Sequence, residues 1–220
     1  MLTVLLVFGL LVCSGFQAVA QEAAPISSPK KTEKRHSSLL QVPPLSWSVL
    51  LPGLELGIAE LPESRAKQNG AVFVFLRIDP ALHPFSLHMA SDEGASLSLS
   101  DWSLRGDLRA GINASMYLPD NTTSTGYMRR GSSTNNARIG GKLGAFFVAG
   151  NRTPAERKAD ILERESGDLR NELEQYDIVV QNYRLINSRG KVLWLEGGPE
   201  NSIAAIAKDA RGRILFTLCQ

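Results

Sequence analysis

The sequence predicts an α+β fold with a mainly antiparallel sheet and one or two surface helices. Three observations predict it. About eight or nine short apolar or alternating segments are separated by turn residues, as is typical of antiparallel strands. One segment carries a strong helix-start pattern. The chain has 220 residues, of which 43% are hydrophobic, and this length favours a single domain over two.

The first half of the chain contains the clearest strand patterns. Residues 71–78 are almost continuously apolar, so we expect them to form a central strand of the sheet. The turn pair Pro52-Gly53 separates two shorter patterns, and the second of these alternates between apolar and polar residues. Further strands are therefore expected over residues 47–51, 54–59 and 85–89.

The middle of the chain is more polar. A short helix is expected to start near Asp101, with Ser100 or Asp101 as its cap, and a strand is expected over residues 112–117. A stretch rich in Gly, Asn, Ser and Thr then covers residues 120–141. A loop of roughly twenty residues without secondary structure is uncommon in a compact domain unless it serves a site.

One helix is strongly indicated after an apolar strand over residues 145–149. The sequence Thr-Pro-Ala-Glu at residues 153–156 is a capping box with proline at the first helical position. Apolar residues at helical spacing then reach Leu173, so we expect a surface helix of about five turns. Gly167 interrupts the pattern, which leaves two shorter helices as an alternative.

Strand patterns return in the last part of the chain. They are expected over residues 177–186, 191–195, 202–207 and 214–218. The last of them runs into Cys219-Gln220 without a turn or a polar tail. Because natural termini usually end in a few loosely held residues, we expect the fold to continue beyond the last residue of this sequence.

The N-terminal region predicts a secreted or periplasmic protein. Residues 1–20 combine the apolar run 2–16 with the small-residue pattern Ala-Val-Ala at 18–20, as a secretory signal peptide does. The run is shorter than a membrane-spanning helix requires, but no basic residue precedes it, so an uncleaved anchor is an alternative. Residues 21–45 are polar, basic and rich in proline, and they predict a flexible tether to a domain over 46–220.

Composition excludes several classes of function. A net charge of +2 leaves little positive excess for neutralising phosphates, which argues against nucleic acid as a partner. With two cysteines and three histidines, no zinc cluster is expected. The sequence also lacks the glycine patterns of nucleotide-binding loops, so we expect neither a metal nor a cofactor. These features leave the oligomeric state open.

Several short motifs follow one another along the predicted domain. The central one is Asn-Ala-Ser-Met-Tyr at residues 113–117, preceded by Trp102 and followed by Gly126-Tyr127. The others are Pro-Gly-Leu-Glu at 52–55, Arg-Ile-Asp-Pro at 77–80, Gly-Ala-Phe-Phe at 144–147, and residues 181–191 and 209–216. In this order they resemble the phosphodiester glycosidase family. The resemblance implies an exported enzyme that hydrolyses a sugar-1-phosphodiester in an envelope or extracellular glycoconjugate, with a carbohydrate or sugar-phosphate polymer as its partner.

Three departures from the family pattern leave other functions open. Residues 201–206 contain no arginine, whereas many members carry one before the penultimate strand. Residues 182–184 read Asn-Tyr-Arg where many members have a Gly-Pro pair. A C-terminal family segment that holds an acidic site residue has no counterpart in this sequence. A non-catalytic polysaccharide-binding relative and a truncated, inactive fragment are therefore the alternatives.

The implied reaction needs a carboxylate near the anomeric carbon and cations or N–H groups on the phosphate. Because a phosphate leaves easily, strong help from a general acid is less necessary than in other glycosidases. Asp120, which follows the central motif, is the leading catalytic candidate, and Asp79 is the second. Alternatively, Asp120 orders only its own turn.

Six further residues are candidates for substrate binding. The two arginines would contact phosphate, or else form surface ion pairs. The two amides would hydrogen-bond sugar hydroxyls or brace neighbouring backbone, and the two tyrosines would stack on a sugar ring or fill the core. These residues are Arg77, Asn113, Tyr117, Tyr127, Arg129 and Gln181.

Overall fold

The structure is a computed structural model. It describes residues 3–6, 45–60, 72–94, 96–151, 159–165, 167–193 and 203–219. The expected capping box at 153–156, nearly all of the expected tether and most of the expected signal peptide lie outside these residues.

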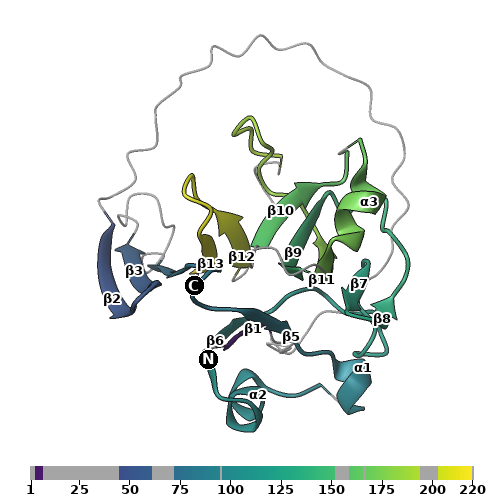
Figure 1. Cartoon of the computed structure of the whole chain (residues 1–220), viewed down its shortest axis with the longest axis horizontal. Helices are drawn as coiled ribbons and strands as arrows, with labels where there is room; N and C mark the ends of the chain where they lie inside the picture. Colours follow the sequence, from purple (N-terminus) through teal and green to yellow (C-terminus); the bar gives the residue numbers. More distant parts are fainter. Residues whose placement is uncertain are drawn as a thin grey trace, which may run out of the picture.

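Two five-stranded antiparallel sheets form the body of the molecule, as the predicted fold class requires (Figure 1). The first sheet has the order β12 (Ile203–Lys208), β13 (Ile214–Cys219), β4 (Val72–Ile78), β3 (Leu54–Glu60) and β2 (Ser46–Leu51). The second has the order β10 (Ala159–Glu163), β9 (Ala145–Asn151), β11 (Tyr176–Asn182), β7 (Met128–Arg130) and β8 (Ser133–Asn136). The central position predicted for residues 71–78 is confirmed, because β4 is the middle strand of its sheet.

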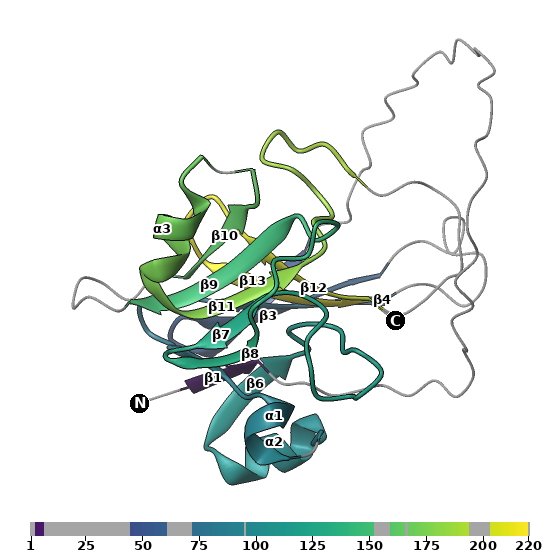
Figure 2. The ribbon, with the colours of Figure 1, turned by 90° about the vertical axis from the view of Figure 1, so that its right-hand side faces the viewer.

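A third, smaller sheet is parallel and contains β5 (Phe85–Leu87), β1 (Thr3–Leu6) and β6 (Leu108–Ile112), in that order. The short helices α1 (Ala90–Glu93) and α2 (Leu99–Arg105) lie next to it, whereas α3 (Leu169–Glu174) lies against the second five-stranded sheet (Figure 2). None of the described helices is long and apolar enough to cross a membrane.

The main core lies between the two large sheets. Ile78 and Ile214 from the first sheet and Phe147 and Val180 from the second belong to one buried cluster. The ring of Phe85 links the layers, because it contacts Phe147 edge-on at 5.4 Å and Phe216 at 5.9 Å between ring centroids. Such aromatic pairs add to the stabilisation that burial of apolar area already provides.

Residues 145–149 of β9 are apolar without interruption, because both faces of this strand are buried. Phe147 and Ala149 face the main core, while Phe146 and Val148 face a second cluster that includes Leu173 of α3. Successive side chains of a strand point to opposite faces, and here both faces are covered. A continuous apolar run is the expected pattern for such a strand.

The short helix near Asp101 is confirmed, but its cap lies earlier than predicted. Ser98 is the N-cap, and its hydroxyl accepts a hydrogen bond from the Asp101 backbone N–H. The carboxylate of Asp101 accepts one from the Ser98 N–H in return, which completes a capping box. The helix buries Trp102 against Leu97 and Leu108.

The expected helix of about five turns is wrong. Residues 159–163 form β10, which pairs along its whole length with β9, and helix α3 starts only at Leu169. Spacing of apolar residues in a short segment fits a strand as well as a helix, and the exposed edge of β9 supplies the pairing partner. The predicted loop over 120–141 is also wrong, since β7 and β8 form a hairpin within it.

The strand predicted over 112–117 begins and ends earlier, as β6, Leu108–Ile112. Beyond it, Tyr117 forms an isolated bridge with Ser124. The segment therefore leaves the small parallel sheet and closes a separate narrow loop before β7.

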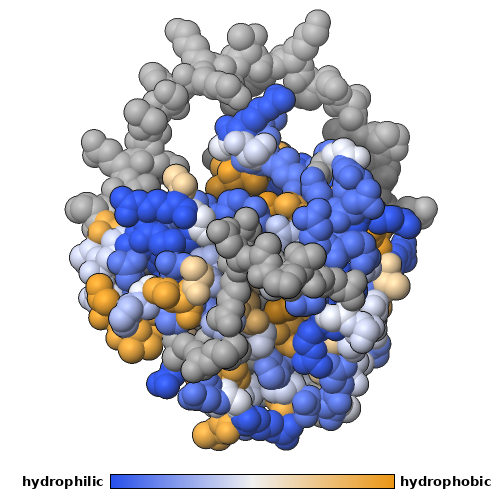
Figure 3. Space-filling model, in the orientation of Figure 1, coloured by the Kyte–Doolittle hydropathy of each residue, from blue (hydrophilic) through white to orange (hydrophobic). Residues whose placement is uncertain are grey.

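Apolar surface remains on β2, at the edge of the first sheet. Val49 is 70% exposed and Leu50 is 49% exposed. Figure 3 shows hydrophobic residues at the left of the molecule, where β2 lies in Figure 1.

Leu54 and Leu104 provide a matched test of the core. Leu54 is 3% exposed and Leu104 is 86% exposed. We expect Leu54→Ala to lower the free energy of unfolding by about 2–5 kcal/mol, because it removes buried area and leaves a cavity, and Leu104→Ala to change it by less than about 0.5 kcal/mol. Urea denaturation measures both, and equal effects would contradict the proposed core.

Candidate functional site

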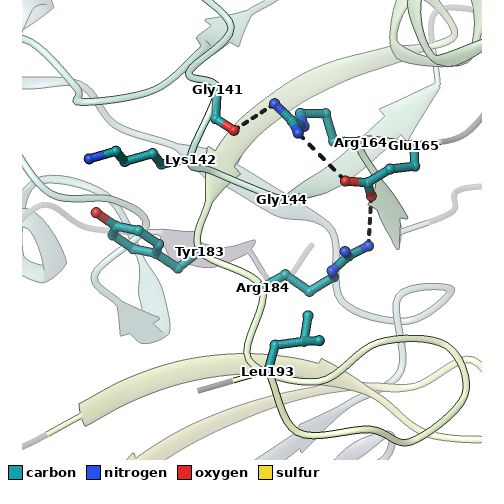
Figure 4. Close-up of a pocket in the computed structure, with 8 residues that line it drawn as sticks. All are labelled: Gly141, Lys142, Gly144, Arg164, Glu165, Tyr183, Arg184 and Leu193. Atoms are coloured by element: carbon teal, nitrogen blue, oxygen red, sulfur yellow. Dashed lines mark hydrogen bonds and ion pairs between the residues drawn. The ribbon is translucent and has the colours of Figure 1, made fainter. Parts of the chain in front are cut away.

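A polar pocket of about 280 Å³ opens beside the second five-stranded sheet. It is lined by Gly141, Lys142, Gly144, Arg164, Glu165, Tyr183, Arg184 and Leu193 (Figure 4). Three of these residues are cations and one is a carboxylate, so the lining favours an anionic group.

Strand pairing brings these residues together from distant parts of the sequence. Ala145, the first residue of β9, is in register with Glu163 of β10 and with Asn182 of β11. Because β9 is antiparallel to both neighbours, the residues that precede β9 meet those that follow β10 and β11. Residues 141–144, 164–165 and 183–184 therefore lie at one edge of the sheet.

Arg184 is the centre of the charge network. Its Nη1 lies 2.8 Å from a carboxylate oxygen of Glu165 and 2.9 Å from one of Glu163. The Nε atom of Arg184 is buried and, among the described residues, has no hydrogen-bond partner. A buried N–H without an acceptor is costly, so this donor is suited to an acceptor from a ligand or from water.

Arg164 and Glu165, which directly follow β10, line the pocket next to Arg184. Arg164 donates a 2.6 Å hydrogen bond to the carbonyl oxygen of Gly141 and lies 3.6 Å from Glu165. The pKa of Glu165 is lowered, mainly by a hydrogen bond from its own backbone N–H, with Arg184 and Arg164 adding to the effect against the opposing influence of burial. Glu165 is therefore ionised at neutral pH.

Gly144 lies close to Arg184 in the lining of the pocket. A Cβ atom at this position would lie 3.2 Å from the Cβ of Arg184 and 3.5 Å from its Nε. A side chain here would require Arg184 to shift by a few tenths of an ångström. This contact gives a structural reason for the glycine that opens the Gly-Ala-Phe-Phe motif.

Gln181 is placed next to the pocket but is not open to it. Its side chain is fully buried; Nε2 donates to the carbonyl oxygens of Gly140 and Leu143, at 3.0 and 2.8 Å. Its Oε1 accepts from the backbone N–H groups of Gly140 and Tyr127, at 2.8 and 3.2 Å. These bonds saturate the amide, so Gln181 orders the loop that carries Lys142.

Arg129 and Tyr127 form hydrogen bonds that hold neighbouring segments together. Arg129 is 5% exposed. Its guanidinium donates to the carbonyl oxygens of Gly131, Leu173 and Tyr176 and to the hydroxyl of Tyr127. These four acceptors tie the β7 hairpin to α3 and β11.

Asn113 and Tyr117 lie in the segment that passes the end of β11. The side chain of Asn182 donates a 3.1 Å hydrogen bond to the carbonyl oxygen of Ala114. This bond ties the residue after the exposed Asn113 to the residue that precedes Tyr183 and Arg184 in the pocket lining. Tyr117 is half-buried, and burial raises the pKa of its hydroxyl, which keeps it protonated.

Asp120 is held within its own turn. Its carboxylate accepts hydrogen bonds from the backbone N–H groups of Thr122 and Thr123, at 2.9 and 2.8 Å, and from the Thr123 hydroxyl. These hydrogen bonds lower the pKa of Asp120, and the bond from the Thr123 hydroxyl has the largest effect. A carboxyl group with a lowered pKa is a poor general acid at neutral pH, although it remains exposed to solvent.

Arg77 and Asp79 lie on the other five-stranded sheet. Arg77 donates to Glu55 at 2.7 Å and stacks on Trp47, with its guanidinium carbon 3.8 Å from the ring centroid. Asp79 accepts from the backbone N–H of Ala81 in the turn after β4. The two predicted catalytic carboxylates, Asp79 and Asp120, thus occupy separate turns.

The pocket residues could not be recognised as a set from the sequence. Arg184 stood out there only as a departure from the family pattern, and Arg164 and Glu165 were expected in a helix. Their positions along the chain could have indicated the site: Arg164 and Glu165 follow β10, Arg184 follows β11, and both strands pair with β9. Recognising it requires the strand order, which the sequence alone did not provide.

Metal ligands are not clustered in the described ranges. Within them, no group of three or more His, Cys, Asp or Glu side chains is placed so that it could hold a metal ion.

Comparison of the chain with protein-family models, with curated proteins and with solved structures gives no match.

Gln181→Leu tests the role assigned to this amide. We expect a loss of about 2–4 kcal/mol in the free energy of unfolding, because four backbone groups, all buried or partly buried, lose their partners. Gln175→Leu, at an exposed position directly after α3, should change it by less than about 0.5 kcal/mol. Chemical denaturation of both variants measures this, and a neutral Gln181→Leu would contradict the bracing role.

The turn at Asp120 predicts a pH dependence. Because folding lowers the pKa of this carboxyl, its contribution to stability is present above the ordinary value of 3.8 and is lost as the pH falls through the folded pKa. The melting temperature of the wild type should therefore exceed that of Asp120→Asn at pH 7, and the difference should shrink below about pH 4.

A second variant checks the cause of this shift. Thr123→Val removes the hydroxyl that contributes most to the lowered pKa. In an NMR titration, the Asp120 carboxyl should then have a higher pKa than in the wild type. An unchanged value would contradict the assigned hydrogen bond.

Proposed function

We propose that this chain is an exported phosphodiester glycosidase-like protein, secreted or periplasmic, that binds and hydrolyses a sugar-1-phosphodiester of an envelope or extracellular glycoconjugate in the pocket described above. One observation carries the proposal. Two of the segments that resemble the family, residues 144–147 and 181–191, meet at this pocket, whose lining contains three cations and one carboxylate.

The phosphate is the part of the substrate that fits the lining best. Among the described residues, no group accepts a hydrogen bond from the buried Nε–H of Arg184, and Arg164 and Lys142 line the same cavity. Arginine guanidinium groups bind phosphate oxygens through paired, charge-assisted hydrogen bonds. Lys142 is exposed, so its ammonium group is free to move toward a second phosphate oxygen.

Tyr183 offers a surface for the sugar. Its side chain lines the pocket and is 40% exposed, on the same side as Lys142 (Figure 4). An aromatic face with a polar edge suits the apolar face of a pyranose ring and its hydroxyl groups. In this arrangement the sugar stacks on Tyr183 while its phosphate faces the cations.

Glu165 is the carboxylate placed to act on the anomeric carbon. Its lowered pKa keeps it ionised, which suits a nucleophile or a group that stabilises an oxocarbenium-like centre. The phosphate group departs as an anion and is stabilised by the arginines. This division of roles needs no strong general acid.

A second function, binding without hydrolysis, is favoured by a different observation. Glu163 and Glu165 both pair with Arg184, and Asp120 and Asp79 are held in their own turns. In that case the same pocket recognises a sugar phosphate of a polysaccharide and leaves it intact.

Arg184→Gln tests recognition of the phosphate. We expect the Kd for N-acetylglucosamine 1-phosphate to rise about 10–100-fold, because a charge-assisted hydrogen bond contributes about 1.5–3 kcal/mol. Arg189→Gln, an exposed cation outside the pocket lining, should leave it within about twofold. Titration calorimetry measures both, and equal effects would remove the pocket from the proposal.

Glu165→Gln separates hydrolysis from binding. We expect the wild type to release free sugar from a panel of sugar-1-(methyl phosphate) diesters, followed by NMR, and the variant to lose at least about 100-fold of that activity while still binding. Binding without release of sugar from any diester in the panel would favour the non-catalytic function. Absence of both binding and release would refute both.

A further inference from the structure

A two-stranded arm projects from the body of the molecule after β11. Residues 185–193 form this arm, in which Ile186 and Val192 make an isolated antiparallel bridge. Backbone hydrogen bonds on either side of the bridge, at 2.9 and 3.0 Å, close the ribbon. The arm is the yellow-green loop at the top of Figure 1 and of Figure 2, and it extends away from the two large sheets. Solvent or a binding partner therefore surrounds most of it.

Exposed apolar side chains lie on both faces of the arm. Ile186 is 57% exposed and Val192 is 61% exposed, and because they are bridge partners their side chains share one face. Leu193, the next residue, is 38% exposed and belongs to the opposite face, where it lines the pocket. A stable protein interface buries about 800 Å² on each partner, more than three side chains provide. Apolar groups on both faces of a thin ribbon suit a medium that surrounds it, as lipid does.

The tip of the arm is cationic. Arg189 and Lys191 are both exposed, and among the described residues neither has an ion-pair partner. Residues 185–193 contain no carboxylate. In Figure 3, hydrophilic side chains cover the tip at the top of the molecule, and hydrophobic ones lie just below them. Cations beside exposed apolar side chains are the combination that binds an anionic lipid surface.

The backbone of the tip is hydrogen-bonded within the molecule. The side-chain oxygen of Asn187 accepts hydrogen bonds from the backbone N–H groups of Arg189 and Lys191, at 3.1 and 2.9 Å. Ser188 donates its backbone N–H to the carboxylate of Glu163 at 2.7 Å. An unsatisfied N–H is costly away from water. These bonds therefore keep the three donors satisfied when the tip leaves water.

We propose that the arm, residues 185–193, is a docking element for an anionic lipid surface, in which the cations of the tip contact the headgroups and the apolar side chains enter the acyl boundary. This inference does not depend on the proposed function. Leu193 also lines the pocket, so docking of the arm would hold the pocket beside the lipid. Glu163 connects the two features, because it accepts the Ser188 N–H and pairs with Arg184.

A fluorescent label on the tip tests the proposal in the full-length chain. In a background of Cys13→Ser and Cys219→Ser, Ser188→Cys is labelled with an environment-sensitive dye and mixed with vesicles of phosphatidylglycerol and phosphatidylcholine. The emission should rise at least about twofold and shift to shorter wavelength, because the dye leaves water. Vesicles of phosphatidylcholine alone should give less than about a tenth of this change at the same lipid concentration, because they carry no net charge.

The matched control carries the same dye at Ser132→Cys, an exposed position in the turn between β7 and β8. Its emission should stay unchanged even where another part of the full-length chain binds the vesicles, because the dye reports only its own surroundings. Equal changes at the two positions, or no change at Ser188→Cys, would overturn the proposal.

A double variant of the labelled chain measures the contribution of the cations. Arg189→Gln with Lys191→Gln should raise the lipid concentration at half-maximal emission about 10–30-fold, because both cations that face the headgroups are lost. The control, Arg138→Gln with Arg211→Gln, makes the same change of charge at two exposed positions outside the arm. It should raise this concentration by less than about threefold.

A second double variant measures the contribution of the apolar side chains. Ile186→Ser with Val192→Ser should raise the same lipid concentration at least about tenfold, because two buried apolar contacts with lipid are lost. The control is Val49→Ser with Leu50→Ser, two exposed residues of β2, and it should leave the value within about twofold.

Three results with these variants would overturn the proposal. Two are equal effects of an arm variant and its control, for the cations or for the apolar side chains. The third is a change in dye emission when the protein concentration is raised without vesicles, because a second copy would then cover the arm. If a variant does not fold, as judged by circular dichroism, the two labelled positions in the otherwise unchanged arm decide.

Discussion

The pairing of β9 with both β10 and β11 is the constraint on which the rest of the structure depends. It places a strand whose residues 145–149 are all apolar between two partners, so that one face contributes to the core between the sheets and the other packs against α3. The same antiparallel register fixes where the three strands start and end. The polar segments at those ends therefore share one edge of the sheet, and the pocket is a consequence of this strand pairing.

The buried polar side chains of this molecule differ in whether all of their hydrogen-bonding groups have partners. Gln181 and Arg129 are buried, and their hydrogen bonds are directed at backbone groups of neighbouring segments. They hold loops and a hairpin in place and have little capacity left for a ligand. Arg184 differs, because its guanidinium bridges two carboxylates and still has a buried donor that no described group satisfies.

Much of the fold could be predicted from local patterns. The strands around Pro52-Gly53, the central strand β4 and the hairpin of β12 and β13 follow from alternation, apolar runs and turn residues. The segment 159–163 could not be assigned in this way, since its spacing also fits a helix and the edge of β9 decided the outcome. None of the residues predicted for the site lines the pocket; Gln181 lies beside it and is buried, and the lining residues Lys142, Arg164 and Tyr183 were not candidates.

The sequence by itself determined the fold class, most of the strands and the capped helix near Asp101, because each of these depends on residues close together in the chain. Only the tertiary structure decided which strands are neighbours, that residues 3–6 lie between β5 and β6, and that Lys142, Arg164 and Arg184 face one cavity. Strand order depends on contacts between residues far apart in sequence, and no local pattern specifies which partners those contacts join.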